Sequence, residues 1–322
     1  MAKIGCAGIL VEDTICGPMR QLPRAGQLLA IDSMPVKAGG CAANVAIDLR
    51  KQGLPVDVAG CLGRDASAEG LLACLAQHEV GCAQVTRVDR HPTSKTVILL
   101  VEGEDRRYLH VFGANAAFQV RQIRRDWIDG LKVFYLGGLL AMPGVDTAEL
   151  TDLLRYCRQR GIATVIDVVV PQNQTEMEGL RPLLPHTDYF LPNDDEAQRL
   201  TGCTDTEQQL EALLRCGVGT AIITRGPAGS VAVAAGQRQR WQAGTYRVES
   251  IDPSGAGDAF AAGIITGVLR GWDMGRTLRH AAALGASATT AIGTTDGVFT
   301  AEQAQTFLDT HPLAVSQCEW KG

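Results

Sequence analysis

Short apolar runs rich in β-branched residues alternate with stretches of helical periodicity along most of the chain. Continuous apolar strands separated by amphipathic helices are typical of a mostly parallel sheet that helices cover on both faces. Because no repeat, low-complexity tract or long linker interrupts the pattern, it predicts one α/β domain. The expected strands cover residues 3–11, 56–62, 132–138, 162–170, 187–192 and 220–226. The expected helices cover about residues 42–52, 67–78, 147–160, 205–215, 256–270 and 276–291.

Two segments, residues 13–37 and 93–112, lack helical periodicity. The second contains the runs TVILLV and YLHV on either side of the turn sequence GEDR, which predicts a β-hairpin. Strand pairs inserted in an α/β domain commonly form an edge sheet or a lid. A purely structural flap is the alternative interpretation.

The composition excludes several classes of protein. The chain has 322 residues and a formal net charge of −5, so nothing indicates a nucleic-acid or anionic-membrane partner. No apolar stretch reaches the roughly 18 residues of a membrane span, and the N-terminus has no signal-peptide pattern. The ten cysteines form no CxxC pair, so we expect free thiols rather than zinc ligands or disulfides. These features predict a cytoplasmic protein.

The late sequence DPSGAGDAFAAG, residues 252–263, places a carboxylate inside a glycine cluster after a strand-like run at 245–251. Gly255 and Gly257 allow a tight turn that directs backbone N–H groups toward one point, where the helix dipole also favours an anion. Asp258 beside such an anion hole suits a general base that deprotonates a hydroxyl while the amides hold a transferring phosphoryl group. The alternative is that Asp258 only caps the helix.

An early Gly39-Gly40 pair precedes a helix that contains Asn44. The glycines let a ligand approach the backbone closely, and the Asn44 amide offers both a donor and an acceptor, which suits a polyol. Close packing of the turn explains the glycines equally well.

Asn193 and Glu196 lie three residues apart at the start of a helix, so both can face a metal-bound water and phosphate oxygens. The same spacing is that of a capping box. The turn TRGPAG, residues 224–229, follows a strand and offers a hydroxyl and N–H groups to phosphates. The chain has no GxxxxGK[ST], HExxH or GxSxG motif and no complete GxGxxG after the first strand, which disfavours a dinucleotide oxidoreductase.

The order of these motifs is more specific than any one of them. An early GG-x-x-x-N, then G-x-x-G-x-D at 60–65, N-x-x-E, T-x-G-x-x-G and a late D-x-x-GAGD-x-F-x-x-G together resemble the ribokinase-like, or PfkB, family of carbohydrate kinases. The similarity runs from about residue 3 to 310. It implies a Rossmann-like α/β core with a small β-sheet lid over the acceptor sugar. The core comprises residues 1–12, 38–92 and 113–322, and the lid comprises 13–37 and 93–112.

The resemblance also implies transfer of the γ-phosphate of ATP, with Mg²⁺, to a hydroxyl of a small sugar or sugar derivative. Asp258 is implied as the general base, and the amides of Gly255, Ala256 and Gly257 as the donors that stabilise the transferring group. The implied acceptor-binding positions are Asp13, Gly39, Gly40, Asn44, Gly113 and Asn115. The implied nucleotide-binding positions are Asn193, Thr224, Gly226 and Gly229. The implied metal positions are Asn193 and Glu196 for Mg²⁺, through water and phosphate, and Asp252 for a monovalent cation such as K⁺.

The sequence departs from the family pattern at three positions. Pro253 stands where threonine usually follows the aspartate of the late motif, which weakens the expectation of a cation site. Cys41 stands where ribokinases usually carry lysine, which weakens the expectation of ribose as substrate. Asp167, a candidate phosphate-site residue at a strand end, lacks the neighbouring Asn and Arg of many relatives.

Three alternatives to a sugar kinase remain at this point: a nucleoside kinase of the same fold, a non-catalytic sugar- or nucleotide-binding regulator and, less favoured, the oxidoreductase. We expect a homodimer through the lid, because exposed strands of a flap often pair with a twofold mate. Charged side chains in the lid either contact an acidic or phosphorylated substrate or are simply solvated; they are Arg20, Arg24, Arg106 and Arg107.

Overall fold

The computed structural model describes residues 3–104, 106–171 and 177–320. The strands of the larger sheet are β1 Lys3–Gly8, β4 Val56–Leu62, β5 Gly81–Arg87, β8 Leu131–Leu139, β9 Ala163–Val168, β10 Tyr189–Phe190, β11 Thr220–Thr224, β12 Ser230–Ala234, β13 Gln239–Ala243 and β14 Val315–Glu319. Those of the smaller sheet are β2 Val11–Met19, β3 Val36–Gly39, β6 Ser94–Val101 and β7 Arg107–Val111. The α-helices are α1 Cys41–Lys51, α2 Ala66–Gln77, α3 Arg125–Asp129, α4 Thr147–Gln159, α5 Asp194–Thr201, α6 Thr206–Arg215, α7 Ala256–Arg270, α8 Met274–Ala288 and α9 Ala301–Thr310.

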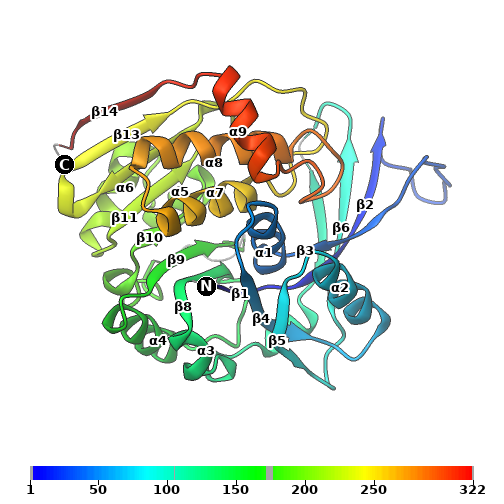
Figure 1. Ribbon diagram of the computed structural model, residues 1–322. Helices are drawn as coiled ribbons and strands as arrows, with labels where there is room; N and C mark the ends of the chain where they lie inside the picture. The colour runs from blue at the N-terminus through cyan, green and yellow to red at the C-terminus, as the bar shows by residue number, and fades with distance from the viewer. Residues whose placement is uncertain (1–2, 105, 172–176, 321–322) are drawn as a thin grey trace.

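The larger sheet has ten strands in the order β14-β13-β12-β11-β10-β9-β8-β1-β4-β5, and the four-stranded sheet β3-β2-β6-β7 stands beside it (Figure 1). In the part of this sheet with the order β11-β10-β9-β8-β1-β4-β5, every neighbouring pair is parallel. Strands β12, β13 and β14 extend the sheet beyond β11 as antiparallel strands. The predicted α/β class, with a mostly parallel sheet and a small separate sheet, is therefore confirmed.

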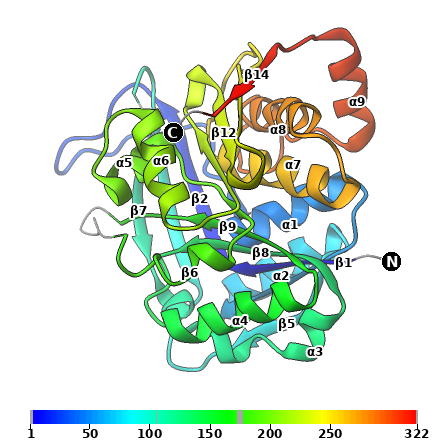
Figure 2. The same ribbon diagram turned by 90° about the vertical axis from the view of Figure 1, so that its left-hand side faces the viewer.

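Helices cover both faces of the larger sheet because side chains alternate across each strand. Val133 and Tyr135 of β8 pack in a core cluster with α1, α2, α7 and α8. Phe134 and Leu136 of the same strand pack in a second cluster with α4, α5 and α6. Figure 2 shows α7 and α8 on one side of the strands and α3 and α4 on the other. Strands that are buried on both faces read as continuous apolar runs, which is why they were recognisable in the sequence.

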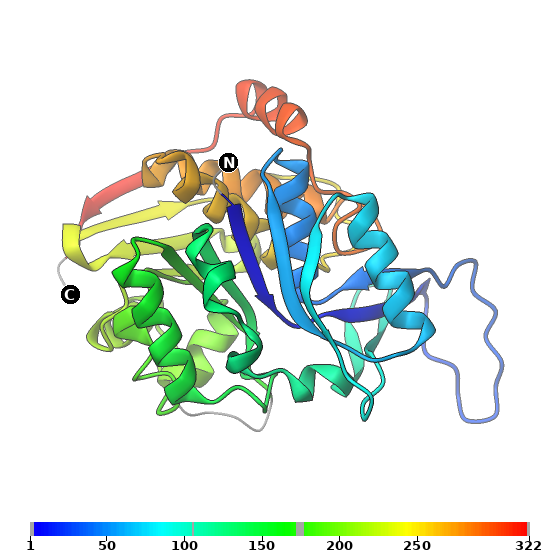
Figure 3. The ribbon, with the colours of Figure 1, turned by 60° about the horizontal axis from the view of Figure 1, so that its bottom comes forward.

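The smaller sheet is built from two separate segments. Strand β2 pairs antiparallel with β3 and parallel with β6, and β6 pairs antiparallel with β7. The predicted hairpin of 93–112 is thus confirmed as β6 and β7. The segment between β2 and β3 projects from the body of the molecule (Figure 3). The domain boundaries expected from the sequence stay a prediction, since membership of a sheet does not by itself define a domain.

Two strand predictions were wrong. The run 3–11 is not one strand, because the chain leaves the larger sheet after Gly8 and enters the smaller one at Val11. The run 245–251 forms no strand. Tyr246 and Val248 pack instead against α8 and α9, in a small apolar cluster with Phe307, so the apolar side chains of this run are buried without a strand partner.

The strand order reverses between β1 and β8. Strands β4 and β5 lie on one side of β1 in the sheet, and β8 to β11, which come later in the chain, lie on its other side. In such sheets ligands bind outside the carboxyl ends of the strands near this reversal. Among the residues that the structure describes, no helix combines the length and apolar character needed to cross a bilayer.

Candidate active site

Asp258 is the third residue of α7, and no side chain caps the N-terminus of this helix. The residue before the helix is Gly255, in the left-handed conformation at φ 79°, and it provides no side-chain cap. Asp258 Oδ2 instead accepts a hydrogen bond from Asn44 Nδ2 of α1 at 2.8 Å. The interpretation of Asp258 as a helix cap is therefore wrong for this structure.

The backbone N–H groups at the start of α7 are largely available. Within the described part of the chain, the N–H groups of Gly255 and Gly257 have no hydrogen-bond partner. The Ala256 N–H donates to Pro253 O at a long 3.4 Å. A Cβ at Gly255 would lie 2.0 Å from Thr294 O, so only glycine fits this turn. Unpaired N–H groups at a helix N-terminus form an anion site.

Asn44 connects Asp258 to the segment after α8. Thr294 Oγ1 donates to Asn44 Oδ1 at 2.9 Å and lies 3.1 Å from Ala38 O. Both polar atoms of the Asn44 amide are thereby used, one by Thr294 and one by Asp258. The structure thus gives Asn44 a role in orienting the carboxylate, and its predicted contact with an acceptor stays a prediction.

The environment of Asp258 shifts its pKa upward. Burial raises the pKa, while hydrogen bonds from Asn44 and from the thiol of Cys41 oppose the rise by favouring the carboxylate. A carboxyl group whose pKa is raised binds a proton more readily than an exposed one. That property suits a general base, provided that the group is ionised before the reaction.

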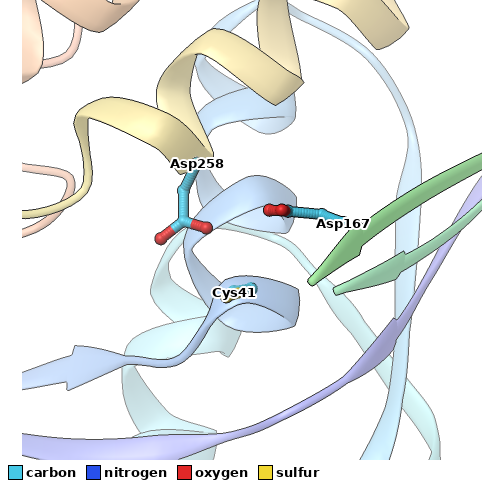
Figure 4. Close-up of side chains that lie close together, drawn as sticks. All are labelled: Cys41, Asp167 and Asp258. Atoms are coloured by element: carbon cyan, nitrogen blue, oxygen red, sulfur yellow. The ribbon is translucent and has the colours of Figure 1, made fainter. Parts of the chain in front are cut away.

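Two further side chains face Asp258. Cys41 lies at the start of α1 and Asp167 at the end of β9, and Figure 4 shows both beside the Asp258 carboxylate. One ligand atom from each of the three residues lies within 4.8 Å of the others. Tyr135 donates to Asp167 Oδ2 at 3.1 Å. Burial, followed by the negative charges of Glu196 and Asp258, raises the pKa of Asp167 well above its usual range.

Asp13 and Gly39 meet where β2 pairs with β3. Asp13 is 5% exposed, and a Cβ at Gly39 would lie 1.8 Å from Asp13 Oδ2. Burial raises the pKa of Asp13 to about 7; a hydrogen bond from Thr96 lowers it, and the charges of Asp258 and Asp252 raise it. The glycine therefore makes room for a buried carboxyl that lies in the field of the other acids. Gly40, at φ 87°, directly precedes α1, and a Cβ there would lie 2.5 Å from Ile9 O.

Gly113 and Asn115 join the two sheets. Asn115 is fully buried, accepts from the Leu10 N–H at 3.1 Å and donates to Leu10 O at 3.0 Å. A Cβ at Gly113, where φ is 48°, would lie 2.5 Å from Pro92 O. Because the Asn115 amide is occupied by the Leu10 backbone, the structure supports a structural role for it. The predicted acceptor contacts of both residues stay predictions.

Asn193 and Glu196 form a capping box, which was one of the two interpretations of their spacing in the sequence. Asn193 Oδ1 accepts from the Glu196 N–H, and Glu196 Oε2 accepts from the Asn193 N–H, both at 2.9 Å. Burial nevertheless raises the pKa of Glu196 to about 7, against the effect of its backbone hydrogen bonds and Arg199, and the charge of Asp258 adds to the rise. Glu196 therefore belongs to the capping box and also lies in the electrostatic field of Asp258. The metal and nucleotide roles of Asn193 and Glu196 stay predictions.

The turn after β11 lies next to this box, since Thr224 forms a parallel bridge with Asn193. Gly226 has φ 50° and Gly229 φ 79°, and a Cβ at Gly229 would lie 2.1 Å from Ala243 O. The Arg225 N–H donates to Gly229 O at 2.8 Å and closes the turn. The structure therefore explains these glycines by the turn itself, and their contact with a nucleotide stays a prediction.

Asp252 is fully buried and binds backbone N–H groups. Its two oxygens accept from Ser254 N at 2.9 Å and from Gly293 N at 3.1 Å. The carboxylate thus fixes the turn before α7 against the segment that carries Thr294. The predicted part in a cation site stays a prediction.

Sequence reasoning missed the residues that orient the site. Thr294, Tyr135 and Thr96 contact Asn44, Asp167 and Asp13 respectively. None of the three belongs to a glycine motif. A polar residue at the end of a buried strand or beside a motif is a signal too common to have singled them out.

Comparison with known proteins gives consistent results. The profile of the family described as "pfkB family carbohydrate kinase" matches residues 1–301. A ribokinase of Arabidopsis thaliana is 27% identical over 275 residues, which are 82% of this chain and 70% of that protein. The structure of Arabidopsis thaliana ribokinase complexed with ribose and ATP has a TM-score of 0.80 at 22% identity, covering 95% of this chain and 98% of that one. A protein described as a ribokinase II of E. coli, in complex with ATP and Mg²⁺, has a TM-score of 0.80 at 19% identity, covering 97% and 100%. These structural identities show that the fold is shared.

Proposed function

Because the chain belongs to the pfkB family of carbohydrate kinases, we propose that it transfers the γ-phosphate of ATP to a hydroxyl group of a small neutral sugar. One observation carries this proposal: the carboxylate of Asp258 is held by Asn44 beside the unpaired N–H groups of Gly255 and Gly257. A proton acceptor and an anion site next to each other are what transfer of a phosphoryl group to an alcohol requires.

Asp258 acts as the general base. As the acceptor hydroxyl attacks the γ-phosphorus, its proton passes to the Asp258 carboxylate, the new O–P bond forms and the bond to the ADP oxygen breaks. The hydrogen bond from Asn44 fixes the direction of the carboxylate, and Thr294 fixes Asn44 in turn. Positioning of this kind supplies much of the rate enhancement in phosphoryl transfer.

The N–H groups of Gly255, Ala256 and Gly257 stabilise the negative charge on the transferring group. They lie at the N-terminus of α7, a helix of 15 residues, where the helix dipole adds to their positive potential. The weak bond of Ala256 to Pro253 leaves that N–H able to turn toward a phosphate oxygen.

The donor set around Glu196 fits ATP with Mg²⁺. Magnesium prefers oxygen ligands and usually keeps several waters. The negative charges of Glu196 and Asp258 raise the pKa of Asp167, and the charge of Asp258 raises the pKa of Glu196. Mg²⁺, when bound with ATP, neutralises phosphate charge. Glu196 and Asn193 would hold its waters, and the turn of Thr224, Gly226 and Gly229 would contact the nucleotide. K⁺ is not part of the proposal; both oxygens of Asp252 accept backbone N–H groups.

Charge favours a neutral acceptor. Asp13 lies in the field of Asp258 and Asp252, so a carboxylate or phosphate on the acceptor would be repelled there. Nearby lysines are paired: Lys37 with Asp296 at 2.7 Å and Lys95 with Glu12 at 3.0 Å. Asp13 can instead accept hydrogen bonds from sugar hydroxyls, which are strong when the acceptor atom is charged.

We also propose that two copies associate through the smaller sheet. Its edge strands β3 and β7 carry exposed apolar side chains, among them Val36 (59% exposed), Leu109 (65%) and Val111 (57%). Exposed apolar edge strands are unusual unless a partner covers them. Light scattering at several concentrations tests this: the wild type should be a dimer and Leu109→Glu a monomer. A wild type that is monomeric at every concentration would refute it.

Release of ADP tests the proposed reaction. The protein is incubated with ATP and Mg²⁺ and, separately, ribose, fructose, fructose 6-phosphate, 2-dehydro-3-deoxygluconate or adenosine, with a reaction lacking acceptor as control. We expect ADP above the control with a neutral sugar. Release with adenosine alone would assign a nucleoside kinase, and release with the acidic or phosphorylated sugar alone would refute the charge argument. No release with any acceptor, in a protein that binds ATP, would favour a non-catalytic regulator.

A further inference from the structure

Cys41, Asp167 and Asp258 form a compact group of potential metal ligands. They come from the start of α1, the end of β9 and the first turn of α7, and they converge although they are far apart in sequence (Figure 4). A sulfur atom and two carboxylate oxygens lie within 4.8 Å of one another. Among the described residues, no other group of three or more His, Cys, Asp or Glu side chains meets this spacing.

The ligand atoms suit a thiophilic ion rather than Mg²⁺. Magnesium is bound by oxygen, whereas Zn²⁺ and related ions accept thiolate together with carboxylate. Around a tetrahedral ion with bonds of about 2.0–2.3 Å, neighbouring ligand atoms lie roughly 3–4 Å apart. Side-chain rotations that move the atoms by about 1 Å therefore bring the three to bonding distance, and a fourth position stays open for water or a phosphate oxygen.

Hydrogen bonds from outside the group orient the two carboxylates. Tyr135 donates to Asp167 Oδ2 and Asn44 donates to Asp258 Oδ2. Each of these bonds fixes one oxygen, Oδ2, of its carboxylate. Partners of this kind are typical of metal sites, because they fix the direction of the ligands.

The charge balance also favours a cation. In the described part of the chain, neither Asp167 nor Asp258 has an ion-pair partner. Two carboxylates this close repel each other when both are ionised, and a divalent ion between them removes the repulsion. Binding would also displace the proton of the Cys41 thiol to the solvent, with the sulfur lone pair forming the new bond and no change of oxidation state.

We propose that a thiophilic divalent cation, with Zn²⁺ as the example, binds to Cys41, Asp167 and Asp258 and inhibits the enzyme by occupying the carboxylate that accepts the proton. The inhibition rests on the proposed function, whereas the binding does not.

Binding is tested with Co²⁺, which gives a near-ultraviolet charge-transfer absorption when a thiolate ligates it. The full-length wild type is titrated with cobalt chloride, alongside Cys41→Ser, Asp167→Asn and, as matched control, Cys318→Ser at the exposed cysteine. We expect the band in the wild type and in the control, its loss in Cys41→Ser, and at least tenfold weaker binding in Asp167→Asn. Zinc chloride should displace the band.

Other outcomes overturn the proposal. A wild type without the band has no thiolate–metal site, and a band that survives in Cys41→Ser but not in Cys318→Ser belongs to the surface. Circular dichroism checks that each variant is folded. If Cys41→Ser does not fold, the Co²⁺ titration of Asp167→Asn decides the question. An affinity of Asp167→Asn for Co²⁺ equal to that of the wild type then refutes the site.

Inhibition is measured as the Zn²⁺ concentration that halves each variant's own rate, at saturating ATP and Mg²⁺, with recovery on addition of a chelator. We expect that concentration to rise at least tenfold in Cys41→Ser and to stay unchanged in Cys318→Ser. Equal sensitivity of both variants refutes inhibition through Cys41. If the protein shows no kinase activity, the proposed function fails while the cobalt spectrum still decides the metal site.

Discussion

Replacement of Gly39 by alanine would place one carbon atom where the carboxyl group of Asp13 lies. The added Cβ would be 1.8 Å from Asp13 Oδ2 and 2.3 Å from its Cγ, whereas ordinary contact begins at 3.4 Å. The φ angle of Gly39 is not in the left-handed region, so the backbone accepts alanine without strain. The carboxyl group must therefore move by about 1.5 Å or more, while no charge in the site is removed.

The expected effect follows from the acceptor role proposed for Asp13. A hydrogen bond to a charged group contributes about 1.5–3 kcal/mol, which corresponds to a loss of roughly ten- to a hundredfold in acceptor affinity. We expect the KM for the sugar to rise by that factor in Gly39→Ala. The kcat should change much less, and the KM for ATP should not change, because Asp258 and the N–H groups of α7 remain in place. Initial rates of ADP release, with sugar and ATP varied separately, measure all three constants.

A control separates this effect from a general cost of adding a methyl group. Gly70 lies in α2, and a Cβ there would meet nothing within 4 Å, so Gly70→Ala should keep wild-type kinetics. Thermal unfolding of both variants checks that they are folded at the assay temperature. A folded Gly39→Ala protein with an unchanged KM for the sugar would refute the placement of Asp13 in the acceptor site.

Three further predictions test the base, the glycine turn and the buried acids. Asp258→Asn should lower kcat about 10²–10⁴-fold with ATP affinity by calorimetry nearly unchanged, and near-normal turnover would remove Asp258 from its role. Gly255→Ala should lower the free energy of unfolding by more than about 1 kcal/mol, since φ is 79° and the Cβ would lie 2.0 Å from Thr294 O. Gly257→Ala, whose Cβ meets nothing within 4 Å, should be neutral or stabilising in the same urea unfolding; equal losses would contradict the geometry. Burial raises the pKa of Asp13 to about 7, above its value of about 4 in an unfolded chain. The folded state therefore binds more protons between these values, and stability should fall as pH rises from about 4 to 7. Asp13→Asn should reduce that fall between pH 5 and 7, and an unchanged slope would count against a buried carboxyl.

The elements that were predicted well are those whose pattern is local. The helix expected at 256–270 is α7, and the strand expected at 56–62 is β4, with the same bounds. Both carry their signal within a dozen residues, as helical periodicity or as one apolar run. The run 245–251 had the pattern of a strand but lacks a partner in the sheet, and a single sequence cannot show whether a partner exists.

The candidate site likewise has one part that the sequence predicted and another that it did not. The position of Asp258 behind Gly255 and Gly257 was readable, because a turn and a helix start are set by neighbouring residues. The partners of Asp258 were not. Asn44 lies 214 residues away from it in the chain, and Thr294 lies 250 residues from Asn44. Asn115 matched a ligand-binding position but bonds to Leu10, 105 residues away.

The sequence by itself therefore determined the α/β class, the glycine turn at the start of α7 and the presence of a carboxylate there. Only the tertiary structure decided which side chains surround that carboxylate, including the Cys41 thiol and Asp167. The physical reason is that propensities and turns act over a few residues, whereas the order of strands in the sheet decides which distant chain segments meet at its carboxyl edge.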